Sequence, residues 1–223
     1  ITHCSTDDRY ADDVHFMGGA IPLDNWFWGG GFFQFMARPG DPEIQGDGWR
    51  KQWMERMEGW EPVASTIWLQ HQRRDDYWRH GSVCENYDDI DCAVFAVGGW
   101  EDGYSNAVPR LLKHLKGPRK GLVGPWGHKY PHIGIPGPAI GWLQESLRWW
   151  DHWLKGVDNG IMDDPMYRVW MREPTVPDAM LKMTQGRWVD EAIWPSPNVG
   201  SRSWALMSDG NAPRTVKPRQ SVG

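Results

Sequence analysis

A short apolar run that ends in two glycines, followed by an amphipathic helix and a second short apolar run, most constrains the fold of this chain. The first run, residues 90–97 (IDCAVFAV), has the composition of a strand that is buried on both faces of a parallel sheet. Residues 105–116 carry their leucines and valine on one side of a predicted helix, and residues 120–124 (KGLVG) form the next strand. Strand, helix and strand make a βαβ unit, so we expect two adjacent parallel strands.

A long helix is predicted to close this α/β sheet. It spans residues 139–155 and ends at Gly156, a residue type that commonly terminates helices. Its apolar residues recur at helical spacing on one stripe, which we expect to face the core: Ile140, Leu143, Leu147, Trp150 and Leu154. The spacing of the tryptophans on this helix is also typical of packing: Trp149, Trp150 and Trp153.

The residues before this α/β core have a different sequence pattern. Residues 1–16 read as the end of a strand and a polar loop, and residues 17–85 as a helical subdomain. Within the subdomain, Asp47 is predicted to cap an aromatic helix that runs to about residue 60, and a polar helix is predicted over residues 65–79. The core itself is expected to span residues 86–160.

Short β-like pieces follow the Asp163-Asp164-Pro165 turn. They cover residues 166–171, 186–193 and 201–208, with turn residues between them. We therefore expect a second, all-β domain over residues 166–223, cut off before enough strands have formed to close a sandwich.

Composition excludes several function classes. The net charge is −5, and lysines and arginines are scattered among acids, so nucleic acid is not an expected partner. No apolar run reaches the roughly 20 residues that span a bilayer, so no membrane partner is expected. The three cysteines lack CxxC spacing, which argues against a disulfide scaffold or a zinc ribbon. A cytoplasmic location is favoured, and a homo-oligomer is compatible with the sequence.

Two Gly- and Trp-containing segments lie just beyond the predicted parallel strands. The first is GGWEDGY, which contains Asp102, and the second is GPWGH, which contains His128. Ligands of open α/β sheets bind at this carboxyl edge. A carboxylate beside an imidazole there fixes the tautomer of the ring and stabilises the imidazolium that forms during acyl transfer. Asp102 and His128 are thus predicted to be hydrogen-bonded, with His128 as general base.

The nucleophile is not evident in these residues. α/β-hydrolases order their triad as Ser, then Asp or Glu, then His, with the serine in a G-x-S-x-G turn. No such pattern occurs, and its nearest imitation contains Ser105, which we interpret as a helix N-cap. Because Ile1 to Cys4 also reads like the inside of a strand, we expect a fragment whose nucleophile precedes Ile1 and which is inactive alone.

The motifs resemble those of a known group of enzymes. GGWEDGYSNAV, GPWGHKYPH, LQESLRWWDHWLKG and GRWVDEAIWPSP with WALMSDG are similar to segments of the cocaine-esterase-like (CocE/NonD) hydrolases, relatives of the X-Pro dipeptidyl-peptidases and the α-amino acid ester hydrolases. The resemblance covers most of the chain and implies a serine hydrolase that cleaves esters or amides. It implies triad roles for Asp102 and His128, a helical cap at residues 17–85 and a jelly roll from residue 166. It places the nucleophilic serine and an oxyanion tyrosine upstream.

One departure from these relatives bears on substrate. The α-amino acid ester hydrolases carry acids two and three residues after the catalytic Asp, where this chain has Tyr104 and Ser105. An aromatic side chain suits an apolar acyl group, so a neutral carboxylic ester is favoured over an amino ester. Four tryptophans are further candidates for the walls of the substrate pocket: Trp100 and Trp126 beside the two motifs, and Trp26 and Trp28 in the cap.

Alternatives remain at this point. His128 and His132 share a turn without a third ligand nearby, so no metal is expected, and the resemblance implies no cofactor. The acidic pairs near the amino terminus lack the spacing of a calcium loop. The rival to an enzyme is a non-catalytic module whose Trp-rich surface binds sugar or peptide, or a degenerate relative of the hydrolases.

Overall fold

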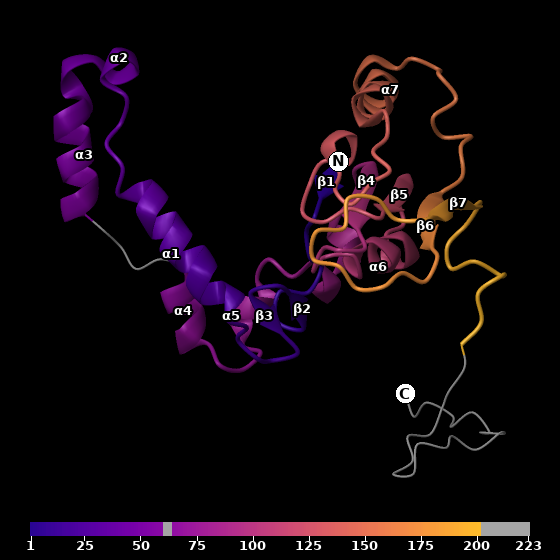
Figure 1. Ribbon diagram of the computed structural model, residues 1–223, viewed down its shortest axis with the longest axis horizontal. Helices are drawn as coiled ribbons and strands as arrows, with labels where there is room; N and C mark the ends of the chain where they lie inside the picture. Colours follow the sequence, from indigo (N-terminus) through magenta and orange to yellow (C-terminus); the bar gives the residue numbers. More distant parts are fainter. Residues whose placement is uncertain (60–63, 202–223) are drawn as a thin grey trace, which may run out of the picture.

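A five-stranded, mostly parallel sheet forms the main body of the protein (Figure 1). The structure is a computed structural model that describes residues 1–59 and 64–201. In spatial order the strands are β1 (Thr2–His3), β4 (Val94–Gly99), β5 (Arg119–Gly124), β6 (Tyr167–Arg172) and β7 (Gly186–Glu191). The first four are parallel and β7 is antiparallel to β6. The predicted βαβ unit is confirmed, because β4 and β5 pair in parallel along their whole length.

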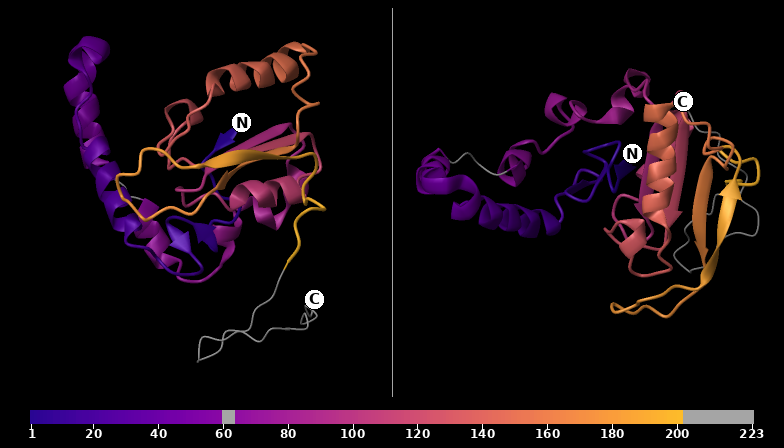
Figure 2. Two further views of the ribbon diagram at one scale, coloured as in Figure 1. Left: turned by 45° about the vertical axis from the view of Figure 1, so that its right-hand side comes forward. Right: turned by 90° about the horizontal axis from the view of Figure 1, so that it is seen from above.

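Helices cover both faces of the sheet. On one face, α6 (Ala107–His114) packs with Ala96 and Val123 in one cluster of buried residues. On the other, α7 (Trp142–Lys155) packs with Phe95 and Leu122. Neighbouring residues of a strand point to opposite faces, so each strand contributes to both clusters. The result is a three-layer α/β/α arrangement, visible in Figure 2.

The buried face of α7 differs from the predicted one. Trp142 and Trp149 are 2% and 1% exposed. The centroids of their rings lie 5.2 and 5.3 Å from the centroid of the Phe95 ring. The stripe expected in the core is mostly exposed, with Leu143 at 61% and Leu154 at 74%. The prediction was wrong because two indoles seven residues apart already form an inner face, and they bury more apolar area than the leucines would.

The strands expected to open a second domain belong to the α/β sheet instead. β6 pairs in parallel with β5, and β7 pairs with β6 from Tyr167–Glu191 to Arg172–Gly186. The predicted domain boundary at residue 166 is therefore corrected, since backbone hydrogen bonds continue across it. The third piece, over residues 201–208, lies outside the described residues after residue 201, and a jelly roll there stays a prediction.

The segment between β1 and β4 is rich in helices, as predicted. Its elements are β2 (Asp12–Asp13), β3 (Phe16–Met17), α1 (Asp24–Met36), α2 (Pro42–Gln45), α3 (Trp49–Glu58), α4 (Ala64–Gln70) and α5 (Asp76–Arg79). Short 3-10 turns are η1 (Gly46–Gly48), η2 (Val83–Glu85), η3 (Tyr87–Asp89) and, after β5, η4 (Pro131–Ile133). In Figure 1, α1 to α3 extend away from the sheet. Their role as a cap stays a prediction.

The starts of three helices differ from the sequence analysis. The polar helix predicted over residues 65–79 is broken, because the Asp75 side chain accepts a hydrogen bond from the Tyr77 backbone and thereby begins α5 as a new helix. Asp47 lies in the η1 turn and does not cap α3. Likewise α6 begins at Ala107 after Asn106, and Ser105 is not its N-cap.

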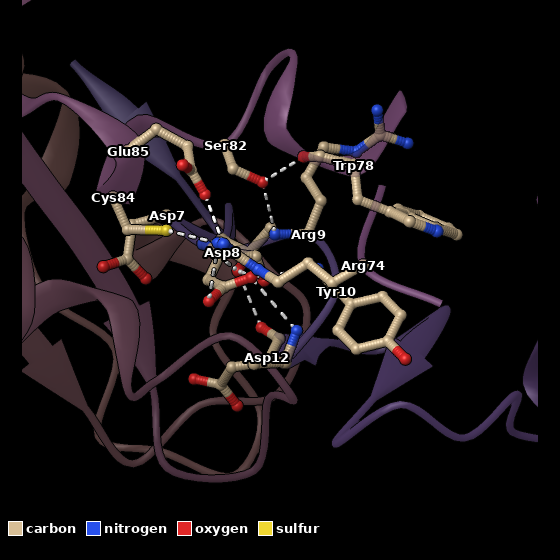
Figure 3. Close-up of polar contacts among 12 residues, drawn as sticks. Asp7, Asp8, Arg9, Tyr10, Asp12, Arg74, Trp78, Ser82, Cys84 and Glu85 are labelled. Carbon is tan, nitrogen blue, oxygen red and sulfur yellow. Dashed lines mark hydrogen bonds and ion pairs between the residues drawn. The ribbon is translucent and has the colours of Figure 1, made fainter. Parts of the chain in front are cut away.

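Polar contacts join the loop after β1 to this helical segment. Arg74 contacts Asp8 at 3.5 Å and Glu85 at 2.5 Å, and its guanidinium also reaches the sulfur of Cys84 (Figure 3). Burial, and then the nearby Asp8 carboxylate, raise the pKa of the Cys84 thiol to about 11. The thiol therefore stays protonated near pH 7.

A second set of contacts joins the same loop to α6. Asp7 is fully buried and accepts hydrogen bonds from Arg110, whose Nε lies 2.9 Å from Oδ1, and from Tyr87. Arg110 also pairs with Asp12 at 2.6 Å. A buried carboxylate needs such partners, and Arg110 thereby joins the loop after β1 and strand β2 to helix α6.

Within the part of the chain that the structure describes, none of the helices has both the length and the apolar content to cross a bilayer.

Candidate active site

The ends of β4 and β5 lie side by side and set the positions of the two predicted site residues. Gly99 and Gly124 are direct partners in the parallel ladder. Beyond them, Trp100 donates its backbone N–H to Gly124 at 2.9 Å, so the two loops begin together. A Cβ on Gly99 would lie 2.0 Å from the carbonyl oxygen of Trp126. Only glycine permits this close approach of the two strand ends.

Asp102 and His128 form a hydrogen-bonded pair at this edge. His128 Nδ1 lies 2.9 Å from Asp102 Oδ2, as the sequence analysis predicted. The Asp102 side chain is 2% exposed, whereas that of His128 is 70% exposed. The other carboxylate oxygen, Oδ1, accepts a hydrogen bond from the Tyr104 backbone N–H at 3.1 Å. The carboxylate is thus held rigidly beneath an imidazole whose outer edge is open.

This geometry suits proton transfer at one atom of the ring. A carboxylate accepts a hydrogen bond from the protonated Nδ1, which leaves Nε2 with a free lone pair. When Nε2 takes a proton, the buried negative charge of Asp102 stabilises the imidazolium. The pair can therefore act as a general base and then as a general acid.

Cys4 is a third member of the site that the sequence analysis did not single out. It follows β1 with φ of +49°, a conformation that is uncommon for residues other than glycine. Its backbone N–H donates to Val97 of β4 at 3.0 Å, which carries the thiol to the same sheet edge. The sequence signal that could have identified Cys4 was its position at the end of the predicted strand at residues 1–4, because parallel strands place the residues at their carboxyl ends at one edge of the sheet.

The thiol of Cys4 is held in its protonated form. Burial, followed by the hydrogen bond to Asp102 and the charge of that carboxylate, raises its pKa to about 12. A thiolate is the reactive form of cysteine, so this residue is a poor nucleophile near pH 7. Its hydrogen bond to Asp102 is the third that the carboxylate accepts, after those from His128 and from the Tyr104 backbone.

The same three side chains form a cluster of potential metal ligands. One ligand atom each of Cys4, Asp102 and His128 lies within 4.8 Å of the others. However, Asp102 and His128 already hydrogen-bond to each other at 2.9 Å. This contact uses the carboxylate oxygen and the ring nitrogen that face each other, so the geometry fits an acid–base pair.

A pocket of about 360 Å³ opens beside the exposed edge of His128. Its lining residues are His3, Cys4, His128, Lys129, Tyr130 and Ile133. Burial, then the neighbouring amino terminus and His132, lower the pKa of His3 to about 4, so its ring is neutral at pH 7. The pocket thus combines apolar side chains with one lysine and the exposed edge of His128.

Tyr104 lies between His128 and the β2–β3 hairpin. Its ring centroid is 5.9 Å from that of His128, and its hydroxyl donates to Asp13 at 3.4 Å. Burial, and then the charge of Asp13, raise the pKa of its phenol well above the usual value. Tyr104 is therefore uncharged beside the imidazole, and it links the sheet edge to the helical segment.

The four predicted tryptophans occupy other places. Trp126 is 1% exposed and packs in the core, where its indole donates to Pro138 at 2.8 Å. Trp100 donates its indole N–H to Trp170 at 2.7 Å. Trp28 stacks on Trp68, while Trp26 borders a different pocket, between α1 and α4. The described lining of the His128 pocket contains none of the four, so their substrate-contact role is not supported by its geometry.

Fold and site together define an α/β protein with a carboxylate–imidazole pair at the carboxyl edge of its sheet, an arrangement typical of hydrolases. Residues 1–130, more than half of the chain, match the family described as X-Pro dipeptidyl-peptidase (S15 family). The chain belongs to this family, and the resemblance to the X-Pro peptidase and CocE/NonD group is confirmed.

Individual relatives agree with this assignment. The chain is 28% identical over 141 residues to a Mycobacterium bovis protein named "Putative serine esterase", covering 60% of this chain and 20% of that protein. It is 26% identical over 137 residues to a Bacillus cereus "Putative Xaa-Pro dipeptidyl-peptidase", covering 55% and 19%. A CocE/NonD family hydrolase from Staphylococcus aureus has a similar fold, with a TM-score of 0.66 and 16% identity over 93% of this chain and 32% of that one. The chain therefore spans about a fifth of the length of these curated relatives.

Proposed function

We propose that this chain contributes the acid–base pair of a serine hydrolase, with His128 as general base and Asp102 as the residue that orients it. The 2.9 Å contact between a nearly fully buried carboxylate and an exposed imidazole carries the proposal. The names of the relatives support it, because one is a "Putative serine esterase" and another a "Putative Xaa-Pro dipeptidyl-peptidase". The nucleophile is proposed to be a serine elsewhere in the protein.

The proposed mechanism uses Nε2 of His128 twice. It first accepts the proton of the serine hydroxyl as the serine attacks the carbonyl carbon of the substrate. It then donates that proton to the leaving alcohol or amine, and an acyl-enzyme remains. Water attacks the acyl-enzyme with His128 again as base, which regenerates the free serine and releases the acid. Asp102 stays ionised throughout and stabilises the imidazolium.

The proposed substrate is a carboxylic ester or an amide, with X-Pro peptides included by the family. An uncharged Tyr104 beside His128, where amino ester hydrolases have acids, favours neutral esters over amino esters. The pocket beside His128 agrees with this preference, because Lys129 in its lining would repel an ammonium placed directly next to the scissile carbonyl, as in an amino ester.

Replacement of His128 in the full-length protein tests the proposal. His128→Ala should lower kcat/KM for a p-nitrophenyl ester by at least about 10⁴-fold, as loss of a triad base does elsewhere. His132→Ala is the matched control, because His132 lies on the neighbouring turn and is not part of the Asp102 contact. Equal activity of wild type and His128→Ala would favour the rival view, a binding module or degenerate relative.

A further inference from the structure

Helix α1 contains three consecutive glycines, Gly29 to Gly31, that its helical structure does not require. Glycine is among the residues least favourable to a helix interior, so a glycine triplet there points to a need for space. Gly29 and Gly30 line a pocket, and a Cβ built on Gly30 would meet no atom within 4 Å. The missing side chain of Gly30 therefore leaves room in this pocket.

The pocket lies between α1 and α4, two helices that run close together in Figure 1. Its volume is about 490 Å³, within the range of pockets that hold small organic ligands. Most of its lining is apolar, from Ile21, Leu23, Trp26, Phe33 and Leu69. It shares no lining residue with the pocket beside His128.

One residue of this pocket lining has a buried polar side chain. Asn25 is 3% exposed and belongs to the pocket wall. Neither its Oδ1 nor its Nδ2 has a hydrogen-bond partner among the described residues. Buried amide groups are nearly always hydrogen-bonded, because leaving them unpaired is costly. An unpaired amide in the wall of a pocket therefore indicates that a ligand supplies the partner.

We propose that this pocket binds a small molecule that carries an apolar group and a primary carboxamide. Asn25 Oδ1 accepts one ligand N–H, and Nδ2 donates to the ligand carbonyl. Both bonds form at once only if the ligand N–H lies on the same side as its C=O, which a primary amide offers and a trans secondary amide does not. The apolar group fills the space above Gly30 beside Trp26 and Leu69.

The binding step includes no chemistry, so the inference stands independently of the proposed hydrolase function. The test uses the full-length protein with His128→Ala, in which turnover is expected to be absent, and isothermal titration calorimetry. Three probes share one apolar group: 3-phenylpropanamide, N-methyl-3-phenylpropanamide and methyl 3-phenylpropanoate. The primary amide should bind at least about fivefold more tightly than either of the others, because only it pairs with both atoms of Asn25.

Three variants separate binding from folding. Gly30→Leu should fill the pocket and weaken binding of 3-phenylpropanamide at least tenfold. Gly31→Leu is the control, because Gly31 has the same open surroundings and does not line the pocket. Asn25→Leu should abolish the preference for the amide while the melting temperature stays equal or rises, since an unpaired polar group is removed.

Three outcomes would overturn the inference. They are equal affinity for the amide and the ester, equal effects of Gly30→Leu and Gly31→Leu, or a marked fall in melting temperature for Asn25→Leu, which would assign Asn25 a structural role. Each leaves the His128 proposal untouched, because ester turnover is measured separately on the wild-type protein.

Discussion

Two apolar-rich helices of this protein, α6 and α1, behave in opposite ways. α6 buries Val108, Leu111 and Leu112 against the sheet and leaves Lys113 and His114 exposed to solvent. α1 is apolar around its whole circumference, and Trp26 and Phe27 are 79% and 68% exposed. An apolar stripe on one side of a helix predicts which face is buried, whereas a helix that is apolar on all sides gives no such prediction. The sheet region therefore has a defined core, and the helical region presents apolar side chains at its surface.

The largest expected effect lies at the sheet edge. Asp102→Asn in the full-length protein should lower kcat by about 10⁴-fold, because an amide neither stabilises the imidazolium nor keeps the same tautomer. Glu101→Gln is the control, since its carboxylate pairs with Arg172 and does not contact His128. Steady-state ester hydrolysis by both variants measures the difference. A similar loss for the two would show that the loop, not the Asp102 carboxylate, matters.

The next effect contrasts the two regions directly. Trp149→Ala removes a fully buried indole from the sheet core and should cost about 3–5 kcal/mol of unfolding free energy. Trp26→Ala removes an indole that is mostly exposed on α1 and should change it by no more than about 0.5 kcal/mol. Urea unfolding of both variants gives the comparison. A large loss for Trp26→Ala would mean that α1 is packed in solution.

A smaller, pH-dependent effect is expected at His3. Its folded pKa of about 4 lies below the ordinary value of 6.5, so the folded state favours the neutral ring. The contribution of this ring to stability is complete above pH 6.5 and is lost as the pH falls from 6.5 through 4. His3→Phe should therefore lose less melting temperature between pH 7 and pH 4.5 than wild type. Parallel curves for the two proteins would contradict this assignment.

The smallest effect concerns the link between the two regions. Tyr104→Phe removes the 3.4 Å hydrogen bond to Asp13 and keeps the ring beside His128. Because the bond is long, we expect a loss of no more than about 1 kcal/mol in stability and at most about fivefold in kcat/KM. A much larger change in kcat alone would give the phenol a direct part in catalysis.

The sheet region was more predictable than the helical one, for physical reasons. A strand buried on both faces has a continuous apolar sequence, so β4, β5 and the loops that carry Asp102 and His128 could be placed from the sequence. The buried face of α7 could not be predicted, because that helix has two apolar stripes and the sequence does not show which one is buried. Cys4 also escaped detection, since its role depends on β1 pairing with a strand far along the chain.

The continuation of the sheet past residue 166 shows a further limit. The sequences of β6 and β7 are compatible with strands of this sheet and with the first strands of a second sheet. Only the register with β5 decides between them, and that register depends on nonlocal contacts.

The central claim, that the sheet edge holds His128 and Asp102 as an acid–base pair, is tested most directly by nitrogen-15 NMR of the imidazole. The account predicts a hydrogen-bonded Nδ1–H resonance that is lost in His128→Gln and disappears or shifts strongly in Asp102→Asn. A His128 ring protonated at Nε2 alone, with a spectrum unchanged by Asp102→Asn, would contradict it.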